Sequence, residues 1–516
     1  MLSSTVASCP VAEHRLCVFY DIDGLDPQAW TGPTFGDLTR NPDNGIPADQ
    51  TEALHGRYSA EPIWKSDDSV VAGDDFYPHL NKLLSGRRPD LLRFFRLSDQ
   101  GRRFLGSADL YAEATASEAR IHKKLRLQFS KAAQIRIAAV GVTPVPLAIV
   151  VEAVSLALFM TANGFAVCHY VFAREDGAPL SAIELLEAEV AIGRFNDVQW
   201  IDRKTKIALP DPGFTLGTLI RQLVFGSTSR IVTSGRVATH VVARFDKILP
   251  VVDRDHYALL LARHYTTDYA LSPGIGRLEW VNDFETVRHA IAMESAATVI
   301  GPTNESPQLP DFLRNFLTST FEAHYLPIAL LALHEHAFLV ERTAATIMSQ
   351  DEMRDAPKSL KRLAELREAA LVLRLCYRFS EQSYITMHNA VNLSWRKVLR
   401  LDEMLAELDD SIRDVAEHIE RLHEGEKARK FAWTATVGSS ALGGLTAYTI
   451  TKESLGLIAA KDVAGAAGIV IGVLIAALVV YFARKKGPSR HGSGHDHEDH
   501  FTVHAMLKHM IKRAQS

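Results

Sequence analysis

Two stretches near the C-terminus decide the architecture: FAWTATVGSSALGGLTAYTI (431–450) and AGAAGIVIGVLIAALVVYF (464–482). Neither stretch contains a charged residue. Because about 20 apolar residues cross a hydrocarbon core of about 30 Å, both are long enough to span a membrane. The alternative is a buried helical hairpin in a soluble protein, but the second stretch has no polar face for such a hairpin to expose. The sequence therefore predicts two transmembrane helices.

Charged residues beside these stretches predict their orientation. The connecting loop carries Lys452 and Lys461, which Glu453 and Asp462 balance. Basic residues flank the pair on its outer sides; they are Lys427, Arg429, Lys430, Arg484, Lys485, Lys486 and Arg490. Because basic flanks stay in the cytoplasm, we expect a multi-pass protein of the inner (plasma) membrane with both termini cytoplasmic. The first residues, MLSSTVASCPVAEHRL, lack the regions of a signal peptide.

The composition is that of an ordinary globular protein. Of 516 residues, 47% are hydrophobic and 23% are charged. The net charge of −4 gives no reason to expect direct binding of nucleic acid. The cysteines, which suit a reducing compartment without a disulfide framework, are Cys9, Cys17, Cys168 and Cys376. Outside the membrane stretches we find no phosphate-binding loop, dinucleotide fingerprint or nucleophile elbow, so we do not expect an enzyme.

The chain divides into regions of different character. The expected domains are an N-terminal cytoplasmic region without an assigned role (1–130), an α/β cytoplasmic domain (131–305), a helical bundle with a coiled-coil stalk (306–430), a two-helix transmembrane domain (431–483) and a basic, histidine-rich cytoplasmic tail (484–516). The expected fold class is therefore α/β followed by a mostly helical C-terminal half.

The α/β region contains recognisable local signals. We expect a strand over 135–142, and a hairpin of strands over 154–160 and 165–173 joined at Ala162-Asn163-Gly164. Ser181 can cap a following helix, with Glu184 at the capping-box position. The apolar run 137–160 is not predicted to span a membrane, because it contains two prolines and a glutamate.

Helical patterns begin at Leu309 and continue to the membrane stretches. Pro327 predicts a kink in the first of them, and SLKRLAELREAALVLRLCYRF (359–379) predicts another helix. Apolar residues then recur at spacings of three and four, which is the repeat of a coiled-coil seam; they are Val398, Leu401, Leu405, Leu408, Ile412, Val415, Ile419 and Leu422. Packing on the chain's own helices is one interpretation. A helix continuing from about 389 into the first membrane stretch favours the other, a stalk that gathers several copies into a homo-oligomer.

The first membrane stretch has a polar stripe. At about 100° per residue, hydroxyl side chains and glycine share one side; these candidate pore-lining residues are Thr436, Ser439, Ser440, Gly443 and Thr446. Such a stripe would waste hydrogen-bonding capacity against lipid. Close packing of helices through small residues is the alternative to a pore.

The combination of an α/β domain, a helical stalk, two C-terminal spans and a basic tail resembles the CorA family of divalent-cation channels, over about 131–486. Local support comes from VSLALFMTANGFAVCHYVFA (154–173), YLPIALLALHEHAFL (325–339) and LSWRKVLRLDEMLAELDDSIRDVAEHIERL (393–422). The resemblance implies a homopentamer, a pore lined by the first span, and a divalent cation as the transported ion, with no other cofactor.

The chain departs from the family at the selectivity motif. Members that conduct magnesium carry Gly-Met-Asn at the outer end of the first span, where this chain has Tyr448-Thr449-Ile450-Thr451 and a neutral loop. No residue of that motif is carried over. CorA-like proteins without it include membrane effectors beside type III CRISPR systems, which respond to a nucleotide second messenger. The expected function is therefore an oligomeric channel gated by its cytoplasmic domain, as a nucleotide-activated effector of antiviral defence. The alternatives are a divalent metal-ion transporter with a degenerate motif and a non-conducting membrane-tethered sensor or scaffold.

A basic segment could bind the phosphate groups of such a ligand. Guanidinium groups interleave there with Phe94, Phe95 and Phe104, and arginine forks suit phosphate; the candidates are Arg87, Arg88, Arg93, Arg96, Arg102 and Arg103. A solvated basic face is the alternative.

Three further patterns have an interpretation. The tail residues His491, His495, His497 and His500 could chelate a metal ion weakly, although the segment is also typical of disordered sequence. Tyr20-Asp21-Ile22-Asp23-Gly24 resembles a phosphatase nucleophile motif but is interpreted as a turn. The His334-Glu335-His336 spacing does not predict zinc catalysis.

The orientation can be tested with single cysteines in a cysteine-free background. Ser454→Cys lies in the predicted outer loop and Ser493→Cys in the predicted cytoplasmic tail. An impermeant thiol reagent added to intact cells should label Ser454→Cys and leave Ser493→Cys unlabelled. Labelling of Ser493→Cys from outside would reverse the orientation.

Overall fold

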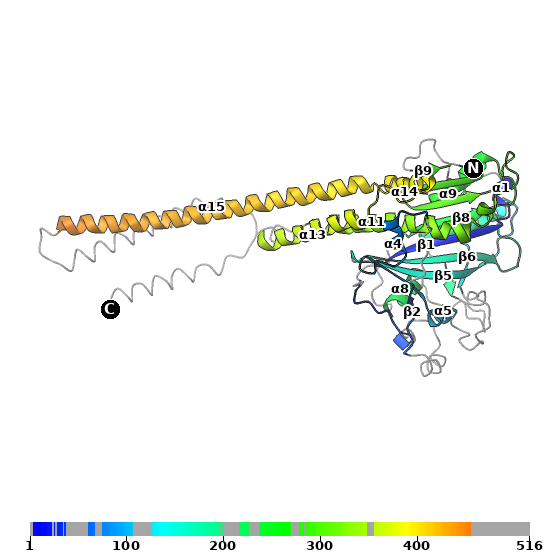
Figure 1. Ribbon diagram of the computed structural model, residues 1–516, viewed down its shortest axis with the longest axis horizontal. Coiled ribbons are helices and arrows are strands. Elements are labelled where there is room, and N and C mark those ends of the chain that lie inside the picture. The colour runs from blue at the N-terminus through cyan, green and yellow to red at the C-terminus, as the bar shows by residue number, and fades with distance from the viewer. Residues whose placement is uncertain are drawn as a thin grey trace. The chain divides into compact units, whose positions relative to one another are not determined.

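The computed structural model describes residues 4–22, 25, 28–34, 36–37, 60–67, 75–106, 125–161, 163–195, 198–200, 216–226, 237–269, 278–282, 284–347 and 356–455; of 437–455 it describes the backbone. The chain forms two compact units, Met1–Glu417 and His418–Ser516. The first is a mixed α/β body and the second begins within a long helix (Figure 1). A mixed α/β fold with a helical C-terminal half is therefore confirmed.

One eleven-stranded sheet organises the first unit. Its strands run in the order β2-β3-β5-β6-β1-β8-β11-β10-β9, and β4 pairs with β5 and with β7. Among the described strands, β8 and β11 form a parallel pair, and every other described pair is antiparallel. The strands are β1 (Glu13–Ile22), β2 (Trp64–Ser66), β3 (Leu92–Leu97), β4 (Leu125–Leu127), β5 (Leu147–Phe159), β6 (Gly164–Arg174), β7 (Val198–Trp200), β8 (Ala238–Arg244), β9 (Leu278–Val281), β10 (Val287–Ala292) and β11 (Ser295–Ile300).

The strand nearest the N-terminus lies in the middle of this sheet. β1 pairs with β6 on one side and with β8 on the other. The domain boundaries predicted at 130 and 305 therefore fall inside one compact unit, and the region 1–130 contributes four of the strands of its sheet. The pairing of β1 joins residues more than 140 positions apart, which no local pattern indicates.

The hairpin predicted around Asn163 is confirmed as β5 and β6, with β5 beginning earlier than expected. The strand predicted over 135–142 is wrong, because the segment 131–139 forms helix α6 (Lys131–Ala139). The hydroxyl of Ser130 caps this helix by accepting a hydrogen bond from the amide of Ala133 at 3.2 Å. Ile135, whose β-branched side chain suggested a strand, is 69% exposed.

The two faces of the sheet have different surroundings. Along β1, Leu16, Val18 and Tyr20 belong to the main hydrophobic core, whereas Arg15 reaches residues of a helix on the other face. Helices whose residues share the core face are α1 (Ser4–Ala7), α6, α7 (Ala182–Val190), α8 (Leu216–Phe225) and α9 (Val251–Ala262). A short π-helix, η4 (Ala191–Phe195), follows α7.

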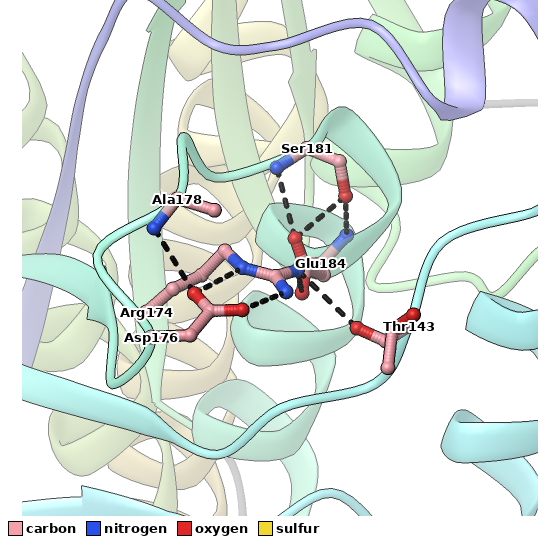
Figure 2. Close-up of polar contacts among 6 residues, drawn as sticks. All are labelled: Thr143, Arg174, Asp176, Ala178, Ser181 and Glu184. Carbon is pink, nitrogen blue, oxygen red and sulfur yellow. Dashed lines mark hydrogen bonds and ion pairs between the residues drawn. The ribbon is translucent and has the colours of Figure 1, made fainter.

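The helix cap predicted at Ser181 is present and forms part of an ion cluster that is buried at Glu184 and reaches the surface at Asp176 (Figure 2). Glu184 accepts hydrogen bonds from the Ser181 amide at 3.0 Å and from its hydroxyl at 2.7 Å. Arg174 pairs with the same carboxylate, which is fully buried, and with Asp176 at 2.6 Å. The hydrogen bond from Arg174 lowers the pKa of Asp176 to about 2. This cluster fixes the start of α7 to the end of β6.

The opposite face is covered by η5 (Phe316–Tyr325), α11 (Leu326–Ala345) and α14 (Thr386–Val398). The break predicted at Pro327 coincides with the change from the π-helix η5 to the α-helix α11, of which Pro327 is the second residue. The proline therefore lies where the hydrogen-bond spacing of the helical stretch changes, and it lacks an amide hydrogen of its own. The remaining described helices of the unit are α4 (Pro78–Leu84), α5 (Asp99–Gly106), α10 (Asp311–Arg314) and α13 (Ala356–Cys376).

One helical stretch among the described residues is long and apolar enough to cross a membrane. It is Phe316–Ala345, with a mean hydropathy of 1.3, and 61% of its most apolar part is buried. Packing against the sheet accounts for much of this apolar character. Of the two predicted spans, 431–450 lies within helix α15 (Leu401–Leu455), and 464–482 lies outside the described residues. Both therefore remain predictions.

A helix continuing from about 389, the condition considered for a stalk, is interrupted, because α14 ends at Val398 and α15 begins at Leu401; from there α15 is continuous through 431–450. Arg400 between them has a φ of 56°, the left-handed conformation that ends helices. An ion pair with Glu403 holds its side chain.

The apolar seam of α15 is occupied within one chain. Val398, Leu401, Leu405, Leu408 and Ile412 are each at most 6% exposed. The helix beside it, α13, carries a matching seam at spacings of three and four, consisting of Leu363, Leu366, Ala370 and Leu373, all at most 4% exposed. The Arg374–Asp409 and Arg378–Asp402 pairs show that the two helices are antiparallel neighbours (Figure 1). Packing on the chain's own helices therefore explains the seam as far as Ile412, and it gives no reason to invoke a partner chain there.

Truncation of the seam should reduce stability without changing assembly. Leu408→Ala removes a fully buried side chain, so we expect a loss of about 2–5 kcal/mol in the free energy of unfolding. Leu393→Ala, at a position 62% exposed, should change it by about 0.5 kcal/mol or less. Thermal unfolding of the full-length protein in detergent measures the first effect, and native mass spectrometry measures the mass. A lower mass for Leu408→Ala at low temperature would mean that the seam joins chains after all.

Candidate functional site

Four helical segments of the first unit meet at a cluster of charged side chains, which we call the junction ion cluster. It consists of Glu335 on α11, Arg378 just after α13, Arg396 on α14 and Asp402 in the first turn of α15. Arg396 bridges the two acids, with Nη1 2.9 Å from Oε2 of Glu335 and Nη2 2.6 Å from Oδ1 of Asp402. Arg378 pairs with both acids as well.

The members of this cluster differ in their contact with water. Glu335 and Arg396 are buried, whereas the carboxylate of Asp402 is 65% exposed. Burial raises the pKa of Glu335, and the charges of Arg396 and Arg378 oppose this shift. Burial likewise lowers the pKa of Arg378. A buried carboxylate needs both cations, since breaking a buried pair leaves an uncompensated charge. The start of α15 is thus attached to the body through charges rather than through apolar packing alone.

The connection between α13 and α14 is held by its own hydrogen bonds. Oδ1 of Asn389 accepts bonds from the amides of Gln382 and Ser383, at 2.8 and 3.1 Å, and its amide group donates to the Ser383 carbonyl. The hydroxyl of Ser383 lies 3.0 Å from Nδ1 of His388 and donates to the carbonyl of Asp75 at 2.8 Å. These bonds fix the segment 382–389, which follows Arg378 of the junction ion cluster closely in the chain.

A second polar feature crosses the sheet beneath η5, and we call it the histidine row. In the strand register, Cys17 of β1 lies opposite His169 of β6 and His240 of β8, and His289 of β10 lies opposite Thr298 of β11. All five side chains are at most 6% exposed. The face of the sheet under η5 is therefore lined by buried polar groups, whereas the opposite face carries the apolar core.

Two histidines of the row share one hydroxyl group. Oγ1 of Thr298 lies 3.0 Å from Nε2 of His240 and 2.9 Å from Nδ1 of His289. A hydroxyl donates a single hydrogen, so at least one of the two rings must donate to Thr298. Burial lowers the pKa of both histidines to about 3, which keeps them neutral near pH 7.

The π-helix η5 lies on this row through aromatic and charged contacts. Phe321 meets the ring of His240 edge-on at 4.8 Å, and Tyr325 stacks on His289 at 5.1 Å. At the end of the histidine row on β6, Glu322 of η5 pairs with Arg15 and lies 3.7 Å from His169. Burial acts to lower the pKa of His169, but its contacts with Cys17 and Glu322 prevail and raise it to about 9.

The arginines predicted to bind a ligand do not converge. Arg93 and Arg96 lie three residues apart on β3 and therefore point to opposite faces of the strand. Arg93 lies over the ring of Phe95 at 4.8 Å, and Arg96 lies 3.8 Å from Asp67. Arg88 pairs with Asp90 at 2.7 Å and Arg102 with Asp99 at 2.6 Å, both on the surface. Arg87 is exposed after α4, and the side chain of Arg103 lies outside the described residues.

The remaining candidate residues from the sequence lie in helix α15 and in the C-terminal tail. Thr436, Ser439, Ser440, Gly443 and Thr446 all belong to α15, but only the first has a described side chain, whose hydroxyl donates to the Ala432 carbonyl at 2.6 Å. The tail histidines His491, His495, His497 and His500 lie outside the described residues. Across the described part of the chain, no three histidine, cysteine or acidic side chains gather closely enough to hold a metal ion.

Two motifs to which the sequence assigns no chemistry prove to be structural. Asp21 lies within β1 opposite Phe165, so the Tyr20–Ile22 part of the predicted turn is a strand, while Asp23 and Gly24 lie outside the described residues. The ring of His334 stacks on Phe159 at 3.7 Å, and Glu335 belongs to the junction ion cluster.

Comparisons with family models, with curated proteins and with solved structures found no match to this chain.

Sequence reasoning missed both polar features. The members of the junction ion cluster span 335–402, and those of the histidine row span 17–298, so no spacing rule joins them. Two weak signals existed for the cluster: Glu335 within an apolar helix, and Arg396 beside Trp395 in a segment with little charge of opposite sign. A charge on an otherwise apolar helical face indicates a buried partner.

A double-mutant cycle should measure the coupling free energy between Arg396 and Glu335 in the junction ion cluster. Arg396→Met leaves the Glu335 carboxylate buried with one cation, so we expect a loss of about 3–5 kcal/mol in the free energy of unfolding. Adding Glu335→Leu to Arg396→Met should recover part of this loss, because the uncompensated charge is then absent. The control is Arg413→Met, which removes an exposed pair with Asp410 worth about 0–1 kcal/mol. Equal losses for Arg396→Met and Arg413→Met would contradict a coupled cluster.

Proposed function

We propose that this protein is an oligomeric membrane channel of CorA-like architecture, whose pore is controlled by its N-terminal unit in the cytoplasm. One observation carries the proposal. Helix α15 contains Asp402 of the junction ion cluster near its start and the uncharged segment 431–450 near its end. Such a helix begins at a cluster of ion pairs and includes a predicted membrane span. It can therefore transmit a conformational change of the N-terminal unit to the pore.

In this proposal the junction ion cluster is the joint that changes between a closed and an open state. Asp402 is bound by Arg378 and Arg396, which come from different helices and also hold the buried Glu335. A ligand can shift such a joint only if it binds its alternative arrangements with different affinity. The carboxylate of Asp402 is 65% exposed, so it can leave Arg378 and Arg396 and still be solvated by water.

The polar stripe of the first span supports a narrow conduction path. Residues Ser439, Ser440 and Gly443 lie on one side of the helical projection, opposite bulky apolar residues. The neutral outer loop offers no ring of carboxylates to concentrate cations, which favours a pore that stays closed without a ligand. A nucleotide-activated defence effector fits these features better than a magnesium transporter does, because the Gly-Met-Asn motif is absent.

Ion flux from reconstituted vesicles tests this proposal. Gly443→Leu places a large side chain on the polar stripe, and flux should fall to the level of vesicles without protein. The matched control is Gly425→Leu, at a position of α15 where an added Cβ would meet no neighbouring group within 4 Å, and this variant should keep wild-type flux. Flux should be low alone and increase when the right nucleotide is added.

Each other outcome has a definite meaning. Wild-type flux through Gly443→Leu under all ligands tried would exclude the first span as pore lining. Steady uptake of magnesium without a ligand would favour a transporter. The absence of flux under every condition, in protein shown to be inserted and folded, would favour a membrane-tethered sensor or scaffold.

A further inference from the structure

Helix α13 carries a second apolar surface on the side away from its seam. Leu371 and Leu375 follow one another at a spacing of one helical turn, and they are 52% and 69% exposed. The seam residues Ala370 and Leu373 on the same helix are at most 3% exposed. The exposed leucines are therefore not needed to attach α13 to its own chain.

Aromatic side chains extend this surface beyond the end of α13. Phe379 follows Leu375 by four residues, and the ring of His79 lies 4.5 Å from that of Phe379. Tyr77 stacks parallel to His79 at 6.0 Å, and Tyr384, which is 64% exposed, lies 4.4 Å from Tyr77. We call the surface formed by Leu371, Leu375, Phe379, His79, Tyr77 and Tyr384 the outer strip. Clustered exposed apolar side chains of this kind mark interaction sites.

The charges beside the outer strip identify its partner. Apart from Arg374, which pairs with Asp409 of the chain's own α15, the exposed charged residues of α13 comprise three basic and two acidic ones, namely Lys358, Lys361 and Arg367 with Glu365 and Glu368. On the neighbouring helix α15, those over 403–417, beyond Asp402 of the junction ion cluster, comprise five acidic ones and one basic one, namely Glu403, Glu407, Asp410, Asp414 and Glu417 with Arg413. The antiparallel pair of helices thus has an apolar flank with a small excess of basic residues and a flank that is strongly acidic.

We propose that the outer strip of α13 packs against the acidic face of α15 in a second copy of this chain. The basic residues Lys361 and Arg367 favour α13 against the acidic face of α15, whereas α15 against α15 would bring acidic side chains together. Ala406 is an exposed apolar residue of the acidic face, and a leucine of the outer strip can pack against it. Because each copy offers two different surfaces, the contact is head-to-tail, and repetition of such a contact generates a ring when the rotation closes.

This inference rests on the proposed channel function, which requires several copies around one pore, but it is tested without measuring flux. One chain has a mass of 57.0 kDa, so native mass spectrometry of the full-length protein in detergent distinguishes single chains from assemblies. Leu371→Glu with Leu375→Glu should shift the population from the assembly toward the single chain. Val252→Glu, at a 79% exposed position of α9, should keep the wild-type mass.

Charge reversal tests the orientation of the contact. Arg367→Glu and Asp410→Lys should each lower the fraction of assembled protein, and the two together should restore part of it. Rising salt should dissociate the assembly more readily in the leucine variants, because screening weakens the charges that remain. Melting temperatures within a few degrees of the wild type would show that the variants are folded, and Leu375→Gln provides a milder change if the glutamates prevent folding.

Two results would overturn the inference. One is a wild-type protein that is a single chain at all concentrations that can be measured. The other is a folded Leu375→Gln or double-glutamate variant that keeps the wild-type mass at raised salt. Failure of the channel proposal looks different, since it would be an intact assembly that conducts nothing.

Discussion

A carboxylate buried where four helices meet must keep its cations, and much of the arrangement of the N-terminal unit follows from this constraint. Glu335 on α11 is accompanied by Arg396 from α14 and Arg378 from the end of α13, and both also hold Asp402 of α15. One point on each of these helical segments is therefore fixed relative to the others by charge. The apolar seam between α13 and α15 then needs only to fill space, because the register is already set at one end.

The features that the sequence predicts well are local ones. The hairpin predicted around Asn163 and the capping box at Ser181 involve residues close together in the sequence, and both are present. The strand predicted over 135–142 failed because Ser130 caps a helix there, and the cap is a stronger local signal than β-branched residues on an exposed side. The central place of β1 could not be predicted, since its neighbours β6 and β8 come from distant parts of the chain.

The coiled-coil seam shows the limit of periodicity. The spacing of Leu401, Leu405 and Leu408 correctly indicates a buried stripe, but it does not say which helix fills it. The partner is α13 of the same chain, whose own seam is visible in the sequence only once the two are compared. The arginines between 87 and 103 show a similar limit, because residues close in sequence point to opposite sides of β3 or pair with nearby acids.

The histidine row has a consequence for the behaviour of the protein in acid. His240 and His289 have a pKa near 3 in the folded unit and about 6.5 in an unfolded chain, so the unfolded chain takes up protons first as the pH falls. The stability that these rings contribute is complete above about pH 6.5 and is lost progressively toward pH 3. Since η5 rests on these rings through Phe321 and Tyr325, acidification weakens the attachment of η5 and α11 to the sheet. Because η5 leads directly into α11, a fall in pH would loosen the same helical stretch that carries Glu335.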